Sequence, residues 1–546
     1  MRLVTRPLSL VVIVTWLGVM AVLVHQSYAQ AGGNLATDLA RYGSSAQWRG
    51  VYYRGEKIGF TVGQTVPLDA TGNGDGNGGF ELQEDGQLQM SLLGVHTFTK
   101  LKTRARVDRS FELQSFEFAL DPGTGPITIT GEIRDRELAM SITSGGATRT
   151  EVRTLAERPM LTLNLVRRLA NAGLTPGARH KWMVFDPATL RNAPVTVSVG
   201  EREVVRGGAA PIPAFRVEME FTGLRTTAWI TDTGEIVREE SPLGFITVRE
   251  TADQAQALAV SGRMRRDLLE SAAVVPEIEA KTPPLPPIGD PRSVRRLRMR
   301  VTGADLTAPD LQGAGQRVSG NMVEIVDAQS LVAGPPDDDL APFLAPEPLI
   351  ESDDPEIRAA ADEAVRGVSG PRARAEALTR YVNATLQKKP TVSIPSAREV
   401  LRTKIGDCNE HTALFVAMSR SLGLPSRIAV GLAYVRGAFY YHAWPEVYIE
   451  DRANRGYWLP VDPTFNQFPA DATHLRFARG GLEKQAAILP MIGNLQMTIV
   501  DLDVTPESTP ILVGREAAAG VPPAVANLPR PRESRWCLPC FLGGHE

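Results

Sequence analysis

The chain has 546 residues, 43% of them hydrophobic, and a formal net charge of −3 from 59 basic and 62 acidic side chains. This length exceeds what one hydrophobic core organises, so we expect two to four domains. The balanced charge leaves no overall basic footprint for binding nucleic acid or an anionic membrane.

The N-terminal segment has the pattern of an export signal. Arg2 and Arg6 precede an uncharged apolar run over residues 8–24, and Ser27 and Ala29 are the small residues expected at positions −3 and −1 of a cleavage site. The apolar run is at the lower limit of length for crossing a bilayer. We expect a signal peptide or membrane anchor over residues 1–29, which would be the chain's membrane contact and place it in the periplasm or on the outer face of the cytoplasmic membrane.

Residues 45–260 read mostly as strands. Short runs of alternating apolar and polar residues, separated by Gly and Asp-Pro-Gly turns, predict an antiparallel β module that forms a part-barrel or curved sheet. A helical pattern interrupts the strands over residues 161–171. The Gly- and Asn-rich residues 69–79 predict a mobile hairpin loop and not a calcium site, because the terminal acidic ligand of an EF-hand loop is missing.

The Pro-rich residues 276–291 predict a stiff linker and the clearest domain boundary. Residues 292–345 then predict a small β subdomain. Within it, Arg296, Arg298 and Arg300 alternate with apolar residues, which predicts a strand with a solvated basic face. A functional anion site on that face is the less favoured alternative.

The most informative feature is an ordered set of Cys408, His442 and Asp462, which follows two amphipathic helical patterns over residues 354–366 and 372–386. A thiol nucleophile needs a base to take its proton, and the base needs a carboxylate to hold it in one tautomer. Because loops separate the three residues, they can converge on one point.

The local patterns agree with that geometry. Apolar residues recur at helical spacing after Cys408, so the thiol should lie at a helix N-terminus, where the dipole favours thiolate. We therefore expect a depressed Cys408 pKa and an ion pair with His442. Strands are expected over residues 427–435, through His442, and over residues 457–461. Pro445, three residues after His442, implies a strand edge or a bulge.

These motifs resemble the transglutaminase-like superfamily of papain-fold thiol enzymes. The matching segments are residues 396–401, 406–408, 420–427, 442–444 and 462–464. The resemblance covers roughly residues 350–480. It implies a papain-like α+β domain, here placed over residues 350–505, with Cys408 as nucleophile, His442 as general base and Asp462 as its orienter.

Other assignments stay open. His411, three residues beyond Cys408, is a rival base without an obvious carboxylate partner. The expected chemistry is acyl transfer from an amide of a protein or peptide substrate. Hydrolysis by a peptidase or amidase is favoured over transamidation, because nothing in the sequence demonstrates an acceptor site. In the alternative of a different class, the β module is a scaffold or envelope binder and the thiol domain serves for docking.

Residues 516–546 predict a disordered tail that contains Cys537 and Cys540. This pair can close on itself or stay reduced, and Cys408 is left without a partner. Zinc would require four ligands, and only His545 is near, so no metal ion and no cofactor are expected. The sequence does not indicate the oligomeric state.

Overall fold

The computed structural model describes residues 46–68, 78–207, 210–221, 223–257, 267–307, 309–336, 339–390, 393–451, 455–480, 491 and 493–505. The N-terminal export pattern, most of the Gly- and Asn-rich loop and the Cys537–Cys540 tail lie outside these residues. Within the described part, none of the helices combines the length and apolar character needed to cross a bilayer.

The N-terminal β module is one antiparallel sheet, which contains fourteen strands in the described residues. Their spatial order is β8-β7-β6-β5-β4-β3-β2-β1-β14-β13-β12-β11-β10-β9. The strands are β1 (Gln47–Tyr53), β2 (Glu56–Leu68), β3 (Gly79–Leu92), β4 (Val95–Asp108), β5 (Leu113–Asp121), β6 (Ile127–Arg134), β7 (Glu137–Ser144), β8 (Ala147–Thr154), β9 (Arg179–Asp186), β10 (Arg191–Gly207), β11 (Ala210–Phe221), β12 (Leu224–Ile230), β13 (Ile236–Glu240) and β14 (Phe245–Glu250). Because β1 pairs with both β2 and β14, the strands before and after the predicted helix join into a single sheet.

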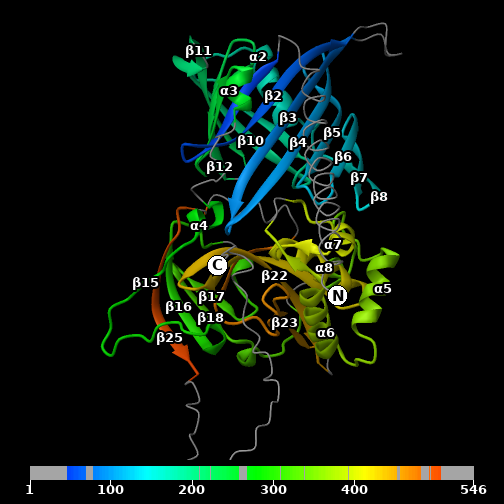
Figure 1. Ribbon diagram of the computed structural model, residues 1–546, viewed down its shortest axis with the longest axis vertical. Helices are drawn as coiled ribbons and strands as arrows, with labels where there is room; N and C mark the ends of the chain where they lie inside the picture. The colour runs from blue at the N-terminus through cyan, green and yellow to red at the C-terminus, as the bar shows by residue number, and fades with distance from the viewer. Residues whose placement is uncertain are drawn as a thin grey trace, which may run out of the picture.

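This sheet curls around helix α2 (Thr162–Ala172), which is the helix expected from the sequence. Leu165 and Leu169 of α2 are almost fully buried against the sheet. The rings of Phe116 in β5 and Phe185 in β9 lie 5.6 Å apart, although their strands are distant in the sheet order. The predicted curved antiparallel sheet is confirmed, and it forms the upper part of the molecule in Figure 1.

The Pro-rich segment is only partly a linker. Its residues β15 (Glu277–Ile278) pair in parallel with β25 (Gln496–Val504), which also pairs with β16 (Val294–Thr302). Strands β17 (Gln316–Ser319) and β18 (Met322–Val326) complete this sheet in the described residues. Its buried side chains belong to the same core as those of the thiol domain, so the expected boundary at residue 345 does not separate two cores.

The basic face of β16 is matched by acidic neighbours. Arg296 pairs with Asp501 at 2.8 Å, and Arg300 pairs with Glu279 at 3.4 Å. A bulge after Val294 breaks the alternation, so that Val294 turns into the core and is 1% exposed. Arg296 and Arg300 thus stabilise contacts within the sheet, whereas Arg298 between them is exposed, as expected of a solvated face.

The thiol domain is built on a second sheet with the order β23-β22-β21-β24 in the described residues. Its elements are α5 (Pro355–Ala364), α6 (Pro371–Thr385), β19 (Gln387–Lys388), α7 (Ala397–Thr403), β20 (Ile405–Gly406), α8 (Cys408–Ser421), β21 (Ser426–Val435), β22 (Ala438–Glu450), β23 (Gly456–Pro460) and β24 (His474–Arg479). Helix α8 packs against β21 and β22 and contacts α5, α6 and α7, so it is the central helix of the domain. The expected helices and strands of this region are confirmed, with ends that differ by a few residues.

Shorter elements connect these parts. They are α3 (Ala252–Gln256), α4 (Leu268–Ala272) and the 3₁₀ turns at Pro291–Ser293, Pro309–Leu311, Ala328–Ser330 and Ala341–Phe343. Helix α4 contacts both β3 and β22, and thereby links the β module to the thiol domain.

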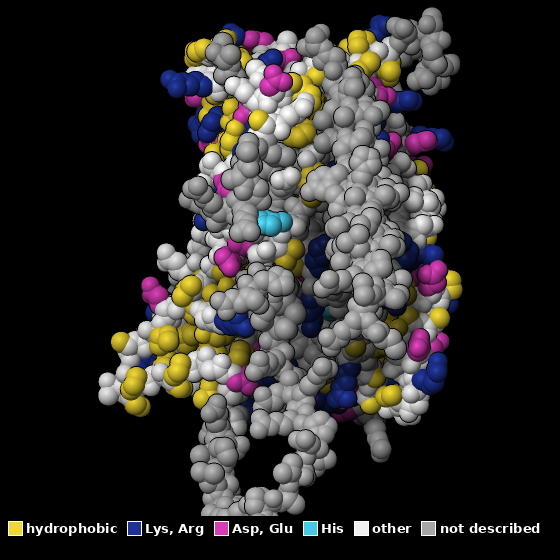
Figure 2. Space-filling view, viewed as in Figure 1, with side chains coloured by type: hydrophobic (Ala, Val, Ile, Leu, Met, Phe, Trp, Pro, Cys, Tyr) yellow, Lys and Arg dark blue, Asp and Glu magenta, His cyan; other side chains and the backbone are white. Residues whose placement is uncertain are grey.

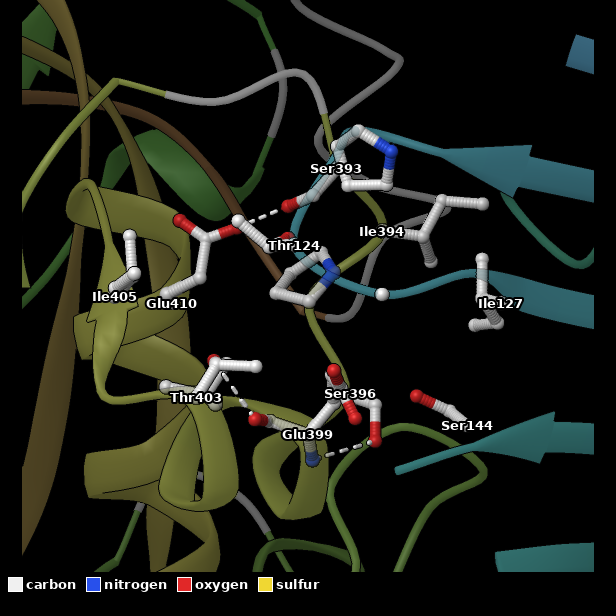
Figure 3. A pocket seen from close by; sticks show the side chains of 14 residues that line it. Thr124, Ile127, Ser144, Ser393, Ile394, Ser396, Glu399, Thr403, Ile405 and Glu410 are labelled. Atoms are coloured by element: carbon white, nitrogen blue, oxygen red, sulfur yellow. Dashed lines mark hydrogen bonds between the residues drawn. The ribbon is translucent and has the colours of Figure 1, made fainter. Parts of the chain in front are cut away.

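The two parts of the molecule also share apolar contacts. Leu349 and Ile394, from segments of the thiol domain, pack into the core of the β module. Figure 3 shows the junction, where Thr124, Ile127 and Ser144 of the β module face the segment around Ile394. The thiol domain is therefore anchored to one end of the curved sheet.

Acidic and basic side chains are interspersed over the face of the molecule seen in Figure 2. This distribution agrees with the net charge of −3 and shows no single-sign region among the described side chains of that face.

Candidate active site

A capping box sets Cys408 at the first position of α8. The side chain of Asp407 accepts a hydrogen bond from the backbone N–H of Asn409 at 2.9 Å, and Glu410 Oε2 accepts one from the backbone N–H of Asp407 at 2.8 Å. Gly406 allows this close approach, because a Cβ there would lie 2.2 Å from the Cβ of Glu410. The sequence from Gly406 to Glu410 therefore specifies the start of the helix and the position of the thiol.

Glu410 also connects the helix that carries Cys408 to the domain junction. Its Oε1 accepts a hydrogen bond from the hydroxyl of Ser393, the residue before Ile394 (Figure 3). Ile394 in turn packs against the core of the β module. The first turn of α8 is thus braced against the segment that joins the two parts.

The Cys408 sulfur lies against the open edge of β22. It receives a hydrogen bond from the backbone N–H of Ala443, the residue after His442. Strand β23 pairs with β22 only from Glu446 onward, so that edge is available to the sulfur. Pro445 lies one residue before this pairing begins, in continuous register with β21, which confirms the expected edge but without a bulge.

The depressed Cys408 pKa expected from the sequence is wrong in direction. Burial raises the pKa of the thiol well above its ordinary value, and the nearby carboxylates of Asp407, Glu410 and Asp462 raise it further. The hydrogen bond from Ala443 opposes these effects but is outweighed. The same acidic residues that cap the helix therefore offset the effect of its dipole, and the resting thiol is neutral.

His442 and Asp462 meet on the sheet. His442 Nε2 lies 2.8 Å from Asp462 Oδ2, and Phe465 stacks on the imidazole with ring centroids 4.7 Å apart. Because Nε2–H donates to the carboxylate, Nδ1 is the basic nitrogen of His442. His442 and Trp444 share one strand face with rings 6.1 Å apart, as the alternation predicts.

Asp462 is completely buried and fully hydrogen-bonded. Its Oδ1 accepts the backbone N–H of Phe465 at 2.9 Å, and its Oδ2 accepts both His442 and a second histidine, His474, the latter at 3.1 Å. Burial alone would raise the pKa of Asp462, but the two imidazoles and their hydrogen bonds lower it far below its ordinary value. The two imidazoles therefore favour the ionised form of Asp462.

His474 and Asp471 were not anticipated from the sequence. His474 begins β24, and its Nδ1 lies 3.1 Å from the backbone oxygen of Asp471 and 3.2 Å from Asp471 Oδ1. Burial lowers the pKa of His474, but Asp471 and Asp462 outweigh burial and raise it to about 10. A usable signal was present, since three of the seven histidines fall between residues 411 and 474.

His411 is poorly placed to act as the base. Its Nδ1–H donates to the backbone oxygen of Asp407 at 2.6 Å, so the ring is held against its own helix. Burial is the largest cause that lowers its pKa, to about 4. His411 is thus a neutral, buried side chain that helps to fix the first turn of α8.

The ligand atoms of His442, Asp462 and His474 lie within 4.8 Å of one another, close enough to consider a metal ion. However, both Nε2 atoms point hydrogens at the same carboxylate oxygen, at 2.8 and 3.1 Å. Metal binding requires imidazole lone pairs in place of these N–H groups. The arrangement therefore fits a hydrogen-bonded chain better than a metal centre.

Comparison with known proteins places this region in a family. The superfamily described as transglutaminase-like matches residues 358–463, which include Cys408, His442 and Asp462. No curated protein matches the chain by sequence.

Three solved structures show limited similarity. A candidate cysteine protease from Cytophaga hutchinsonii is 17% identical, with 39% of this chain and 84% of that chain covered and a TM-score of 0.26. A β-barrel-like protein of unknown function from Brucella abortus is 13% identical, with coverages of 37% and 94% and a TM-score of 0.28. The periplasmic domain of TgpA from Pseudomonas aeruginosa is 17% identical, with coverages of 32% and 88% and a TM-score of 0.19. These scores are too low to support an argument about activity, whereas the sequence match shows that the chain contains a transglutaminase-like domain at residues 358–463.

Proposed function

We propose that the protein is an extracytoplasmic thiol enzyme that forms a thioester between Cys408 and an acyl group taken from a protein or peptide amide. The observation that carries the proposal is the cluster in the first half of β22. There the Cys408 sulfur meets the Ala443 N–H, and the preceding residue, His442, is hydrogen-bonded to Asp462 at 2.8 Å. A buried carboxylate, an oriented imidazole and a thiol at a helix N-terminus are the parts that acyl transfer requires.

In the first step, His442 Nδ1 removes the thiol proton as the sulfur attacks the amide carbonyl. The S–C bond forms, the C–N bond breaks, and the proton passes from His442 to the leaving amine. Because burial and nearby carboxylates keep Cys408 protonated at rest, His442 acts as a general base and not as the partner of a preformed thiolate. Asp462 holds Nε2–H and stabilises the imidazolium formed during transfer.

In the second step, a nucleophile attacks the thioester and the Cys408 thiol is released. Water gives the free acid, which makes the protein a peptidase or amidase, whereas a primary amine gives a new amide, which makes it a cross-linker. We favour hydrolysis because water is present at high concentration, and an amine prevails only if it is bound and oriented. Orientation can supply effective molarities of about 10⁵ M or more, so an acceptor site would reverse this choice.

The proposal is tested by incubating the purified protein with envelope extract, stopping the reaction in acid and identifying the group attached to Cys408 by mass spectrometry. The adduct is expected in the wild type and absent in Cys408→Ala. A peptide substrate supplied with a labelled primary amine then distinguishes the two outcomes. Predominant free acid supports hydrolysis, and predominant amide at low amine concentration shows transamidation. Absence of any adduct or turnover would refute an enzymatic role and favour the alternative of a scaffold or envelope binder.

Export is the second part of the proposal and rests on the sequence over residues 1–29. A C-terminal reporter fusion is expected in the periplasmic or membrane fraction. A mature N-terminus at Gln30 would show cleavage after Ala29, and recovery of residues 8–24 would show an anchor. Activity found mainly in the cytosol would contradict this part.

A further inference from the structure

Both ring nitrogens of His474 face hydrogen-bond acceptors. Nε2 lies 3.1 Å from Asp462 Oδ2, and Nδ1 lies 3.1 Å from the backbone oxygen and 3.2 Å from Oδ1 of Asp471. A neutral imidazole has one N–H and one lone pair, so it could satisfy only one of these sides. The geometry therefore requires an imidazolium, with side-chain exposure of only 3%.

Asp471 is the anion that pairs with this cation, and its carboxylate is held by several hydrogen bonds. Its Oδ1 accepts the backbone N–H of Thr473 at 2.9 Å and the Thr473 hydroxyl at 2.5 Å, and its Oδ2 accepts Gln467 Nε2 at 2.7 Å. Gln467 also exchanges two backbone hydrogen bonds with Asp462, at 2.8 and 2.9 Å. One short loop thus fixes Asp462, Asp471 and His474 relative to one another.

We propose that His474 is a positioning residue of the candidate active site: its fixed positive charge shares Asp462 with His442, so that the carboxylate stabilises an added proton on His442 less than it would without His474. In a triad whose carboxylate is hydrogen-bonded to a single imidazole, its full negative charge would stabilise the protonated form of that imidazole. Here Asp462 Oδ2 is already hydrogen-bonded to a cation, so its stabilisation of a second cation is weaker.

The charges that face the two imidazoles agree with this role. His474 meets Asp462 and Asp471, and its ring lies 5.7 Å from that of His442, centroid to centroid. His442 meets Asp462 through its Nε2 and has uncharged rings beside it, those of Phe465 and Trp444. From the start of α8, the carboxylates of Asp407 and Glu410 act on Cys408 and raise its pKa. A buried unit charge 5.7 Å away shifts a titration by about two pH units at an effective dielectric constant of about 20.

The test is the titration of His442 by NMR of the full chain with ¹³C-labelled histidine in a Cys408→Ala background, so that no substrate or turnover is needed. The His442 signal is assigned by its loss in His442→Gln. In His474→Gln, where an amide can still donate to Asp462, the titration midpoint of His442 should rise by about two pH units. His96→Gln, an exposed substitution in the β module, should leave it unchanged. The His474 signal itself should stay that of an imidazolium from pH 5 to 9.

Asp471→Asn is the second variant, needed if His474→Gln does not fold. It removes the anion that holds His474 in its protonated form. The titration midpoint of His442 should therefore rise by a smaller amount, because the negative charge of Asp471 is lost together with the positive charge of His474. A His442 midpoint that stays constant or falls in both variants, or a His474 signal that titrates near pH 6.5, would overturn the inference.

This inference rests on the proposed function only for the role of His442 as the base. If the shift occurs but no acyl-enzyme is ever trapped, the charge coupling stands and the enzymatic proposal fails. If turnover is lost in His474→Gln without any shift of His442, the residue has a purely structural role and the inference is wrong.

Discussion

Replacement of Asp462 by Asn tests the central geometry most directly. The carboxylate accepts three hydrogen bonds: His442 and His474 at Oδ2, at 2.8 and 3.1 Å, and the Phe465 N–H at Oδ1, at 2.9 Å. The asparagine side chain has only one oxygen, so in either orientation its NH₂ group faces a group that is itself a hydrogen-bond donor: the Phe465 N–H on one side, or the two imidazoles on the other. If the oxygen keeps the Phe465 bond, His442 must present a lone pair at Nε2 and carry its hydrogen on Nδ1. That tautomer cannot accept the thiol proton.

The expected loss in kcat/KM is on the order of 10²–10⁴, which corresponds to about 3–5 kcal/mol in the activation barrier. Stability should also fall by roughly 3 kcal/mol, because the buried His474 imidazolium loses one of its two anionic partners. Steady-state kinetics on a peptide amide and urea unfolding of the same preparations measure both quantities. Asp305→Asn, on an exposed loop, is the matched control and should change neither. A folded Asp462→Asn variant that retains activity within threefold of wild type would refute the assignment of this carboxylate as the orienter.

The same variant has a defined pH signature. The pKa of Asp462 is lower in the folded state than the value of about 3.9 in the unfolded chain, so its stabilisation is present above that pH and is lost as the pH falls. The wild type should therefore lose unfolding free energy more steeply than Asp462→Asn on acidification below about pH 4. An equal or steeper loss in the variant would contradict the depressed pKa.

Three further changes probe the thiol, the sheet and the junction. Glu410→Gln removes one of the carboxylates that raise the Cys408 pKa, so alkylation by iodoacetamide at pH 7.5 should accelerate by about 3–10-fold, while the wild-type rate should still be rising above pH 8.5. Gly431→Ala places a Cβ 1.9 Å from a backbone oxygen of β24, so it should destabilise the fold by about 3 kcal/mol or more and reduce activity at least tenfold by displacing His474. Leu349→Ala removes a side chain buried in the core of the β module and should lower the unfolding free energy by about 2–5 kcal/mol, as measured by calorimetry.

Each of these changes has an internal comparison. A wild-type thiol that reaches its half-maximal alkylation rate below pH 7 would show that a preformed ion pair exists after all. Gly289→Ala meets no atom within 4 Å and should be neutral, so equal effects at both glycines would contradict the steric argument. Leu344 is 38% exposed, and its replacement by Ala should cost far less than that of Leu349.

Local sequence signals predicted most of the elements that carry the site. The helical spacing that follows Cys408 places this residue at a helix start, and the alternation around His442 places that side chain on one strand face with Trp444. These features depend on backbone geometry over a few residues, which is why one sequence suffices to read them. Helix α2 and the short loops at the turns of the β module were predictable for the same reason.

Tertiary structure decided the electrostatics of the site. A helix N-terminus favours thiolate, but the pKa of Cys408 is set by burial and by carboxylates from its own cap and from a distant loop. The sharing of Asp462 between two imidazoles depends on β24 lying beside β21, a pairing that no local pattern encodes. Electrostatic energies depend on distances through space and on the exclusion of water, and neither can be read along the chain.

Long-range pairing also decided the domain organisation. The Pro-rich residues 276–291 carry a clear signal for a linker, yet Glu277 and Ile278 add a strand to a sheet completed by β25, more than two hundred residues later. Likewise, the two runs of strands around α2 become one sheet because β1 pairs with β14. The sequence by itself determined which residues could form helices, strands and a Cys-His-Asp set, because those depend on local sterics and side-chain chemistry. Only the tertiary structure decided which strands pair and which charges meet, because both depend on how distant segments pack together.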